Sequence, residues 1–485
     1  MNVRRLISAA LCGALVLNTP LIYSDISGSD LPDFGDSSGS LISPAQEMAF
    51  GEEFMRYIRA SSKLVSDPDI HGYISQLGQR LVANSDAPSY PFTFFVVDNS
   101  AVNAFAGPGG YIGIHTGLIL TAENESELAG VMAHEIAHVT QRHLLRAYES
   151  AQQMSLPTAA AMIAGILLGV AADSPDAGIA AISAVQAGNI QRQLNFTRAN
   201  EKEADRIGIQ TLARSGIDPY GMPSFFERLH QSTRLYGSNV PEFLSTHPVT
   251  TNRIAESMSR AEKYGRGKDL DSLEFQLIRA RLQVLESSSP QTILSTFQNR
   301  AKKQSAGPAD QYGLALAYWR NNDYATAKKQ LQPLLNKEPD RKIYRISMAR
   351  LELDSGQTDA ALKRFSETLK LYPGDLIVGQ YYTSALIQSG QAAEARDQAV
   401  KMLRNKQART PEIYELWAKA ASVSGPAWET NVASAEVYYL YGNLRFAIDQ
   451  MERALKHKGL SQYERARFEA RLTEFKQILK AREQN

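Results

Sequence analysis

The stretch from Glu123 to Tyr148 constrains the fold most strongly, because its composition predicts one helix that carries a metal-binding pattern. An asparagine can cap this helix, its first turn is acidic, and its interior lacks proline. The sequence HEIAH within it places His134 and His138 at i and i+4, on one helix face. Two imidazoles so spaced can bind one zinc ion, and Glu135 can reach a water on that ion. The stretch is therefore typical of a zinc hydrolase with Glu135 as its catalytic residue.

A third metal ligand is expected downstream, because catalytic zinc keeps three protein ligands and one open position. The run ANEKEAD predicts a second helix, in which Glu201 and Asp205 share one face. Glu203 lies about 200° round the helix from Glu201 and cannot join them. We therefore assign Glu201 to the metal, and Asp205 to the carboxylate that receives the free N–H of a zinc-bound imidazole. An ordinary charged helix surface is the alternative.

These two motifs together resemble the gluzincin-type metallopeptidases of the HtpX, Oma and CAAX-protease group. Val102–Ala106 (VNAFA) and Gly109–Gly110 are similar to the segment that precedes the zinc helix in that group. Ser245–Pro248 (STHP), followed by Arg253, resembles its downstream His-Pro loop. The similarity covers about residues 43–264 and implies a zinc-dependent peptidase with one zinc ion per chain.

The N-terminus predicts a secreted protein. Residues 1–24 carry two arginines, then an apolar run, then small and polar residues, which is the pattern of a cleaved signal peptide. Cys12 is the only cysteine and lies in this signal; lipidation at Cys12 is disfavoured because Leu11 stands where a small residue is needed. Residues 25–42 are rich in serine, glycine and aspartate and are expected to be mobile.

The segment before the zinc helix predicts two helices and two strands. Ser43-Pro44 should open a helix that runs to Ile58, and a second helix is expected near Ile70–Val82. Phe92–Val97 predicts a strand, and Tyr111–Ile114 a further one directly before the zinc helix. If this last strand is an edge strand, its backbone could pair with an extended peptide substrate. His115 at its end is expected to be structural, because the zinc is already fully assigned.

Leu156–Ala172 is nearly continuously apolar, at the short limit for a membrane span. A single crossing would place His138 and Glu201 on opposite sides of the bilayer, although both must contact one zinc. We therefore expect no transmembrane span but an apolar helical hairpin near the cleft. Reversible peripheral contact with a membrane surface is the alternative.

The C-terminal part contains a repeat. Ala327, Ala361 and Ala395 are spaced by 34 residues, and so are Pro339 and Pro373. This period predicts tetratricopeptide repeats, in which small residues stand where paired helices cross and proline ends a repeat. Such arrays form curved surfaces that bind proteins. Four tyrosines are candidates either for lining this surface or for the repeat core: Tyr381, Tyr382, Tyr438 and Tyr439.

The sequence therefore predicts a mostly helical α+β fold, with an HExxH metallopeptidase domain containing a small β-sheet, followed by an all-α tetratricopeptide-repeat solenoid. The formal charge of +1 excludes a strong field that would draw the chain to nucleic acid. The expected divisions are a signal peptide (1–24), a leading segment (25–42), the peptidase domain (43–265), a helical connector (266–307) and the repeats (308–485).

Two function classes remain open. The first is a zinc endopeptidase of the cell envelope, to which the repeats bring protein substrates. The second is a chaperone-like adaptor whose repeats act while the zinc site stays mostly closed. With its predicted signal peptide and its repeats, the chain resembles the periplasmic members of the group in particular. That resemblance implies a mixture, in which the protein degrades misassembled outer-membrane β-barrel proteins, assists their assembly, and reaches the β-barrel assembly machinery through its repeats.

His247 in the His-Pro loop has three candidate roles. It could be a loop-packing histidine, a gate that fills the fourth zinc position, or a donor that stabilises the oxyanion in an open site. The resemblance places this loop near the active cleft, and we favour the gate.

Overall fold

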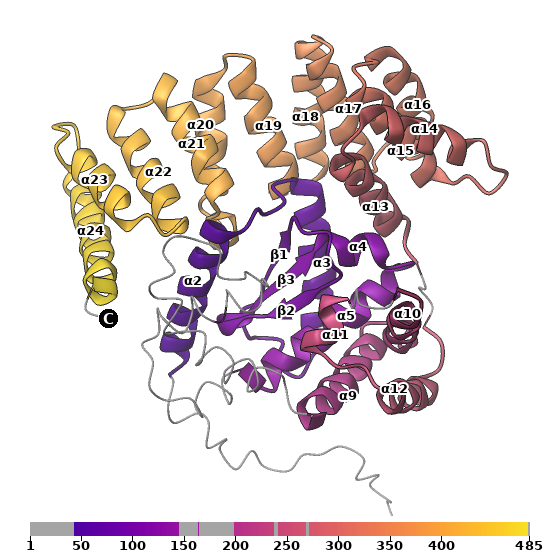
Figure 1. The fold of residues 1–485 in the computed structure, drawn as a ribbon. Coiled ribbons are helices and arrows are strands. Elements are labelled where there is room, and N and C mark those ends of the chain that lie inside the picture. Colours follow the sequence, from indigo (N-terminus) through magenta and orange to yellow (C-terminus); the bar gives the residue numbers. More distant parts are fainter. Residues whose placement is uncertain (1–42, 145–162, 164–197, 237–240, 268–270, 484–485) are drawn as a thin grey trace, which may run out of the picture. The chain divides into compact units, whose positions relative to one another are not determined.

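The computed structural model describes residues 43–144, 163, 198–236, 241–267 and 271–483. The predicted signal peptide, the leading segment and nearly all of the apolar stretch 156–172 lie outside the described residues. Within the described part, none of the helices has the length and apolar character needed to cross a membrane. The described residues from Ser43 onward belong to one compact unit, and the chain is mostly helical with one small sheet (Figure 1).

The sheet has three strands in the order β1-β3-β2: β1 (Thr93–Val97), β2 (Ala104–Ala106) and β3 (Tyr111–His115). Strand β1 runs parallel to β3, whereas β2 runs antiparallel to it. The short 3-10 turn η2 (Pro108–Gly110) joins β2 to β3, and Gly109 and Gly110 adopt φ angles of 69° and 77° there. Only glycine enters this left-handed region freely, so the glycines permit the reversal.

This topology corrects one expectation. The predicted strand Tyr111–Ile114 exists as β3, but it lies between the other two strands and is not an edge strand (Figure 1). Strands β1 and β2 stand at the two edges, and the glycine turn folds the VNAFA segment back along β3.

Four helices surround this sheet. They are α2 (Pro44–Ser61), α3 (Pro68–Val82), α4 (Thr116–Thr121) and α5 (Glu125–Thr140). Ser43 and Gln46 form a capping box at the start of α2, and the Asn124 side chain caps α5 by accepting from the Glu127 N–H. The predicted helix starts are thus confirmed, and α5 places the HEIAH residues in the interior.

The end of α5 differs from its prediction. The zinc helix was expected to reach Tyr148, but α5 ends at Thr140. Arg142, two residues later, has a φ of 55°, which a continuous right-handed helix cannot accommodate. Hydrophobic periodicity does not reveal such a backbone reversal, so the sequence predicted a helix that continues past Arg142.

Helices α9 (Arg198–Arg214), α10 (Gly221–Tyr236), α11 (Glu242–Thr246) and α12 (Thr251–Tyr264) follow in the part of the chain before the repeats. Gly208 on α9 lets this helix approach α5 closely, because a Cβ there would lie 3.1 Å from the backbone nitrogen of His134. The second predicted helix, with Glu201 and Asp205, is confirmed as α9 and packs directly on the helix that carries the two histidines.

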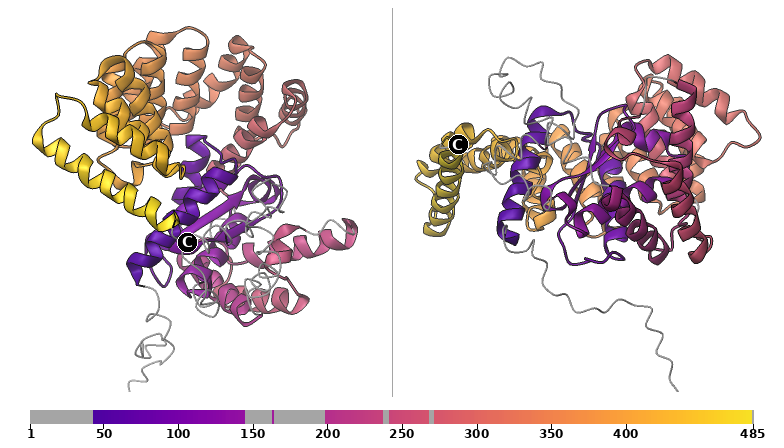
Figure 2. Two further views of the ribbon diagram at one scale, coloured as in Figure 1. Left: turned by 60° about the vertical axis from the view of Figure 1, so that its left-hand side comes forward. Right: turned by 60° about the horizontal axis from the view of Figure 1, so that its bottom comes forward.

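The rest of the chain is helical, as the repeat pattern predicts (Figures 1 and 2). Ala327, Ala361 and Ala395 are fully buried where neighbouring helices meet, and Gly356 and Gly390 end their helices with φ angles of 80° and 77°. The helices are α13 (Leu273–Glu286), α14 (Pro290–Ala301), α15 (Pro308–Arg320), α16 (Tyr324–Lys337), α17 (Lys342–Asp354), α18 (Thr358–Leu371), α19 (Leu376–Gln388), α20 (Ala392–Met402), η3 (Lys406–Ala408), α21 (Pro411–Ser424), α22 (Ala427–Leu440), α23 (Leu444–Leu455) and α24 (Gln462–Glu483).

The structure decides the role of three of the four tyrosines. Tyr381, Tyr382 and Tyr439 are buried, so they belong to the core rather than to an open surface, whereas Tyr438 is half-buried. Tyr439 stacks on Phe475 of the last helix with ring centroids 4.8 Å apart. Aromatic side chains at helical spacing thus stabilise the helix packing here.

A buried arginine joins α13 to its surroundings. The Arg281 side chain is 2 % exposed, and its Nε and Nη2 donate to both carboxylate oxygens of Asp67 at 2.8 and 2.7 Å. Arg281 also donates to the hydroxyls of Tyr312 and Tyr381 at 3.2 and 3.1 Å. Asp67 caps α3, so one side chain links that helix to α15 and α19.

We expect Arg281→Ala to destabilise the protein by about 3–5 kcal/mol, because it leaves the buried carboxylate of Asp69 and the mostly buried one of Asp67 without their cation. Urea unfolding of the full-length chain measures this effect. Arg341→Ala is the matched control: Arg341 pairs with Glu274 at 2.9 Å, but both side chains are partly exposed, so its loss should cost about 1 kcal/mol or less. Equal effects of the two substitutions would contradict the assignment of Arg281 as a buried link.

Candidate metal centre

Four buried side chains from three regions of the chain converge on one point. His134 and His138 come from α5, Glu201 from α9, and His247 from the residue that follows α11. Each offers one ligand atom, and these atoms all lie within 4.8 Å of one another. The predicted residues are therefore brought together as expected, and the histidine of the His-Pro loop joins them.

The distances within this group suit a shared ion. The Nε2 atoms of His134 and His138 lie 3.0 Å apart, and Nδ1 of His247 lies 3.3 Å from His134 Nε2. Glu201 Oε1 is 3.4 Å from His138 Nε2 and 3.0 Å from His247 Nδ1. Imidazole nitrogens and a carboxylate oxygen are donors that zinc and similar transition metals accept. The four side chains can hold a metal ion.

Glu135 stands beside this group without belonging to it. It is fully buried, and the backbone N–H of Ala106 faces its carboxylate. Its Oε1 lies 3.5 Å from Nε2 of His247. Burial raises the pKa of Glu135 above the ordinary carboxyl value, against the opposing effect of His247 and His134. A buried carboxylate with a raised pKa beside a metal group suits proton transfer near neutral pH.

Asp205 contacts the far side of the first imidazole. Its Oδ1 lies 3.0 Å from Nδ1 of His134, so this carboxylate can fix the ring while Nε2 faces the metal group. Burial disfavours the charged form of His134, but Asp205 and Glu201 outweigh it and raise the pKa of His134 to about 9. Burial likewise opposes the charge on Asp205, yet His134 and Arg253 lower its pKa.

Arg253 holds the carboxylates in place. Its Nε and Nη2 donate to the two oxygens of Asp205, both at 2.8 Å, and Nη1 lies 2.8 Å from Oε2 of Glu201. The same Nη1 donates to the backbone carbonyl of Pro248 at 2.9 Å. One guanidinium therefore ties α9 to the His-Pro loop. In the sequence, only the family resemblance indicated Arg253.

The residues that precede strand β2 position His247. Phe243 donates its backbone N–H to the carbonyl of Val102 at 3.1 Å, and His247 donates its own N–H to the carbonyl of Phe243 at 2.8 Å. The imidazole of His247 stacks on the Phe243 ring with centroids 4.8 Å apart. The VNAFA segment and the His-Pro loop are thus connected parts of one site.

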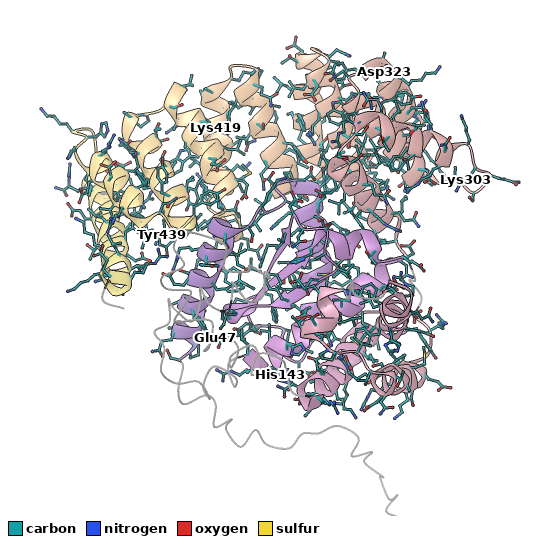
Figure 3. All side chains as sticks on the ribbon, in the orientation of Figure 1. Glu47, His143, Lys303, Asp323, Lys419 and Tyr439 are labelled. Atoms are coloured by element: carbon teal, nitrogen blue, oxygen red, sulfur yellow. The ribbon has the colours of Figure 1, made fainter. Side chains whose placement is uncertain are left out.

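Two further histidines fall outside the metal group. His115 is fully buried, and burial lowers its pKa to about 4 against the opposing effect of the Ala101 backbone. This fits the expected structural role. His143, labelled in Figure 3, contacts His138 from the side away from the metal group, with the two Nδ1 atoms 2.9 Å apart. The sequence reasoning missed His143, because a continuous helix would point it elsewhere.

Comparison with known proteins agrees with this geometry. The sequence pattern of peptidase family M48 matches residues 68–261. "Beta-barrel assembly-enhancing protease" of Escherichia coli (strain K12) is 37 % identical over 93 % of this chain and 92 % of its own length. "Putative beta-barrel assembly-enhancing protease" of Vibrio cholerae is 37 % identical over 96 % and 94 %. "Metalloendopeptidase OMA1, mitochondrial" of Danio rerio is 32 % identical over 43 % of each chain.

The last similarity covers less than half of this chain, whereas the first two cover nearly all of it, the helical repeats included. The buried His-His-Glu-His group lies within the M48 match. This chain is a metallopeptidase that acts on proteins, and it belongs to the β-barrel assembly-enhancing protease family of M48 peptidases.

Proposed function

We propose that this chain is a zinc endopeptidase of the periplasm, which degrades misassembled outer-membrane β-barrel proteins and assists the assembly of others. The observation that carries the proposal is the group of buried metal-ligating atoms beside the carboxylate of Glu135. The names of its relatives supply the substrate class, and the charge and apolar run of residues 1–24 supply the route to the periplasm. The repeats would contact the clients and the β-barrel assembly machinery.

His134, His138 and Glu201 would hold the zinc ion. When bound, this ion supplies Lewis acidity, which polarises the scissile carbonyl and makes the attacking water more acidic. Glu135 accepts the proton of that water and passes it to the leaving nitrogen of the peptide bond. Asp205 keeps His134 in the tautomer whose Nε2 faces the metal, and Arg253 orients both carboxylates.

For His247 we propose the gate. Its Nδ1 lies among the donor atoms of the other three ligands, 3.0 Å from Glu201 and 3.3 Å from His134. From this position the imidazole can occupy the fourth metal position, where the attacking water must otherwise bind. The peptidase would then remain inactive until the loop that starts at α11 moves. A peptidase that shares a compartment with its clients benefits from such a closed resting state.

His247→Ala should therefore raise basal proteolysis, including self-cleavage, of the purified full-length protein. The competing oxyanion role predicts the opposite sign, a loss of turnover by about 10²–10³-fold. Gel analysis of timed incubations with an unfolded substrate measures both. The double variant His247→Ala, Glu135→Gln is the control, and it should remain intact. Reduced cleavage by His247→Ala without any self-degradation would exclude the gate.

The chaperone-like adaptor remains the second candidate, and the closed arrangement of His247 favours it over an always open protease. Glu135→Gln separates the two activities in cells that lack the wild-type protein. If the peptidase and the assembly activity are distinct, stalled β-barrel clients should persist while assembly of other clients continues. Loss of both activities would tie assembly to hydrolysis, and retention of both would remove hydrolysis from the function.

A further inference from the structure

The chain reverses direction after α5 through a strained, left-handed backbone conformation, which an ordinary helix end does not need. Arg142 adopts a φ of 55°, and a left-handed residue other than glycine costs roughly 1–2 kcal/mol. Its side chain pairs with Glu47 at 3.6 Å, but it is 27 % exposed, so this pair is too weak to offset the strain. Such backbone strain persists where the surrounding structure requires it. We therefore ask what the conformation of Arg142 does for the next residue, His143.

The reversal brings His143 back onto the metal group. In a continuous helix, His143 would lie about 140° round the axis from His138 and could not touch its ring. In the structure His143 is fully buried, and its Nδ1 lies 2.9 Å from Nδ1 of His138. Its other nitrogen, Nε2, lies 3.1 Å from Oε2 of Glu203. Figure 3 labels His143 together with Glu47.

The metal-binding role of His138 determines which ring nitrogens of His138 and His143 carry protons. An imidazole that binds a metal through Nε2 keeps its proton on Nδ1 and donates it to an acceptor. For His138 the group at that position is Nδ1 of His143, which must therefore be the acceptor. Neutral His143 then carries its proton on Nε2 and donates it to the carboxylate of Glu203.

We infer that His143 is a positioning residue that orients metal ligand His138, and that Glu203 fixes the tautomer of His143. The inference rests on the proposed metal role of His138. It gives the second ligand histidine an acceptor equivalent to the one that Asp205 gives His134. It also assigns a role to Glu203, whose side chain is 36 % exposed and lies off the metal group.

Zinc affinity of the full-length protein, measured by competition with a chelator, tests the inference. His143→Leu removes the acceptor and should weaken zinc binding by about 10–100-fold. His143→Asn places a carbonyl oxygen near the position of Nδ1, so it should keep affinity within a few-fold of the unsubstituted protein. Glu203→Gln retains an acceptor for the Nε2 proton and should likewise keep the affinity. Thermal unfolding after chelator treatment checks that each variant is folded.

Unchanged zinc affinity in His143→Leu would overturn the inference. Equal losses in the Leu and Asn variants would also overturn it, because they would indicate packing rather than a hydrogen bond. Should His143→Leu fail to fold, ¹⁵N NMR of the histidine-labelled parent protein decides: a proton on Nε2 of His143 supports the inference, and one on Nδ1 contradicts it.

Failure of this inference can be told apart from failure of the proposed metal site. If His134→Ala loses zinc while His143→Leu binds normally, only the role of His143 is wrong. If His134→Ala retains zinc, the metal assignment itself is wrong.

Discussion

Glu135→Gln should abolish peptide hydrolysis while leaving the fold and the bound metal unchanged. Glutamine has nearly the same shape as glutamate but cannot accept the proton of the attacking water. The Glu135 carboxylate faces the backbone N–H of Ala106 and Nε2 of His247, and the amide oxygen of glutamine can keep the contact with Ala106. The loss of general base catalysis should lower turnover by about 10²–10⁴-fold. Turnover on an unfolded protein substrate, together with metal content, measures both halves of the expectation.

A matched control is Glu256→Gln. Glu256 is also a helical glutamate, but its side chain is 35 % exposed and pairs with Lys202 and Arg260 instead of the metal group. This variant should retain turnover close to that of the unsubstituted enzyme. Comparable losses at both positions would mean that the role assigned to Glu135 is not specific.

The second large effect concerns the ligands. His134→Ala, His138→Ala and Glu201→Ala should each lose bound zinc, because each removes one of the donors that converge at the site. Glu203→Ala should retain bound zinc, at most with a lowered affinity, because it removes the acceptor of His143 and not a metal donor. Asp205→Ala should weaken affinity by about 10–100-fold without abolishing binding, as expected when a ligand histidine loses its acceptor. Metal analysis after gel filtration in zinc-free buffer distinguishes these classes.

Equal zinc loss in Glu203→Ala would contradict the assignment of the helix face. In the structure Glu201 and Asp205 are buried toward α5, whereas Glu203 is partly exposed beside His143. Retained zinc in any one of the three ligand variants would remove that residue from the proposed set, and His247 would then be the nearest substitute.

Much of this arrangement could be predicted from spacing. Helical geometry alone places His134 with His138, and Glu201 with Asp205, because residues four apart share a face. The 34-residue repeat predicted the buried alanines at helix crossings, and the capping residues predicted where helices start. These features are local, so a single sequence carries them.

The remaining features depend on contacts between distant segments or on backbone reversals. The end of α5 at Thr140 depends on the left-handed Arg142, which has no signature in an apolar pattern. The central place of β3 depends on how the glycine turn folds β2 back. Arg281 draws its partners from α3, α15 and α19, up to 214 residues away in the case of Asp67.

The central claim is that the converging side chains hold a catalytic zinc ion, and metal analysis of the purified full-length protein, paired with cleavage of an unfolded substrate, tests it most directly. We predict one zinc ion per chain, loss of cleavage when a chelator removes it, and recovery when zinc is returned. Well-folded protein that contains no zinc and binds none on addition, or that cleaves equally well after the metal is removed, would contradict the claim.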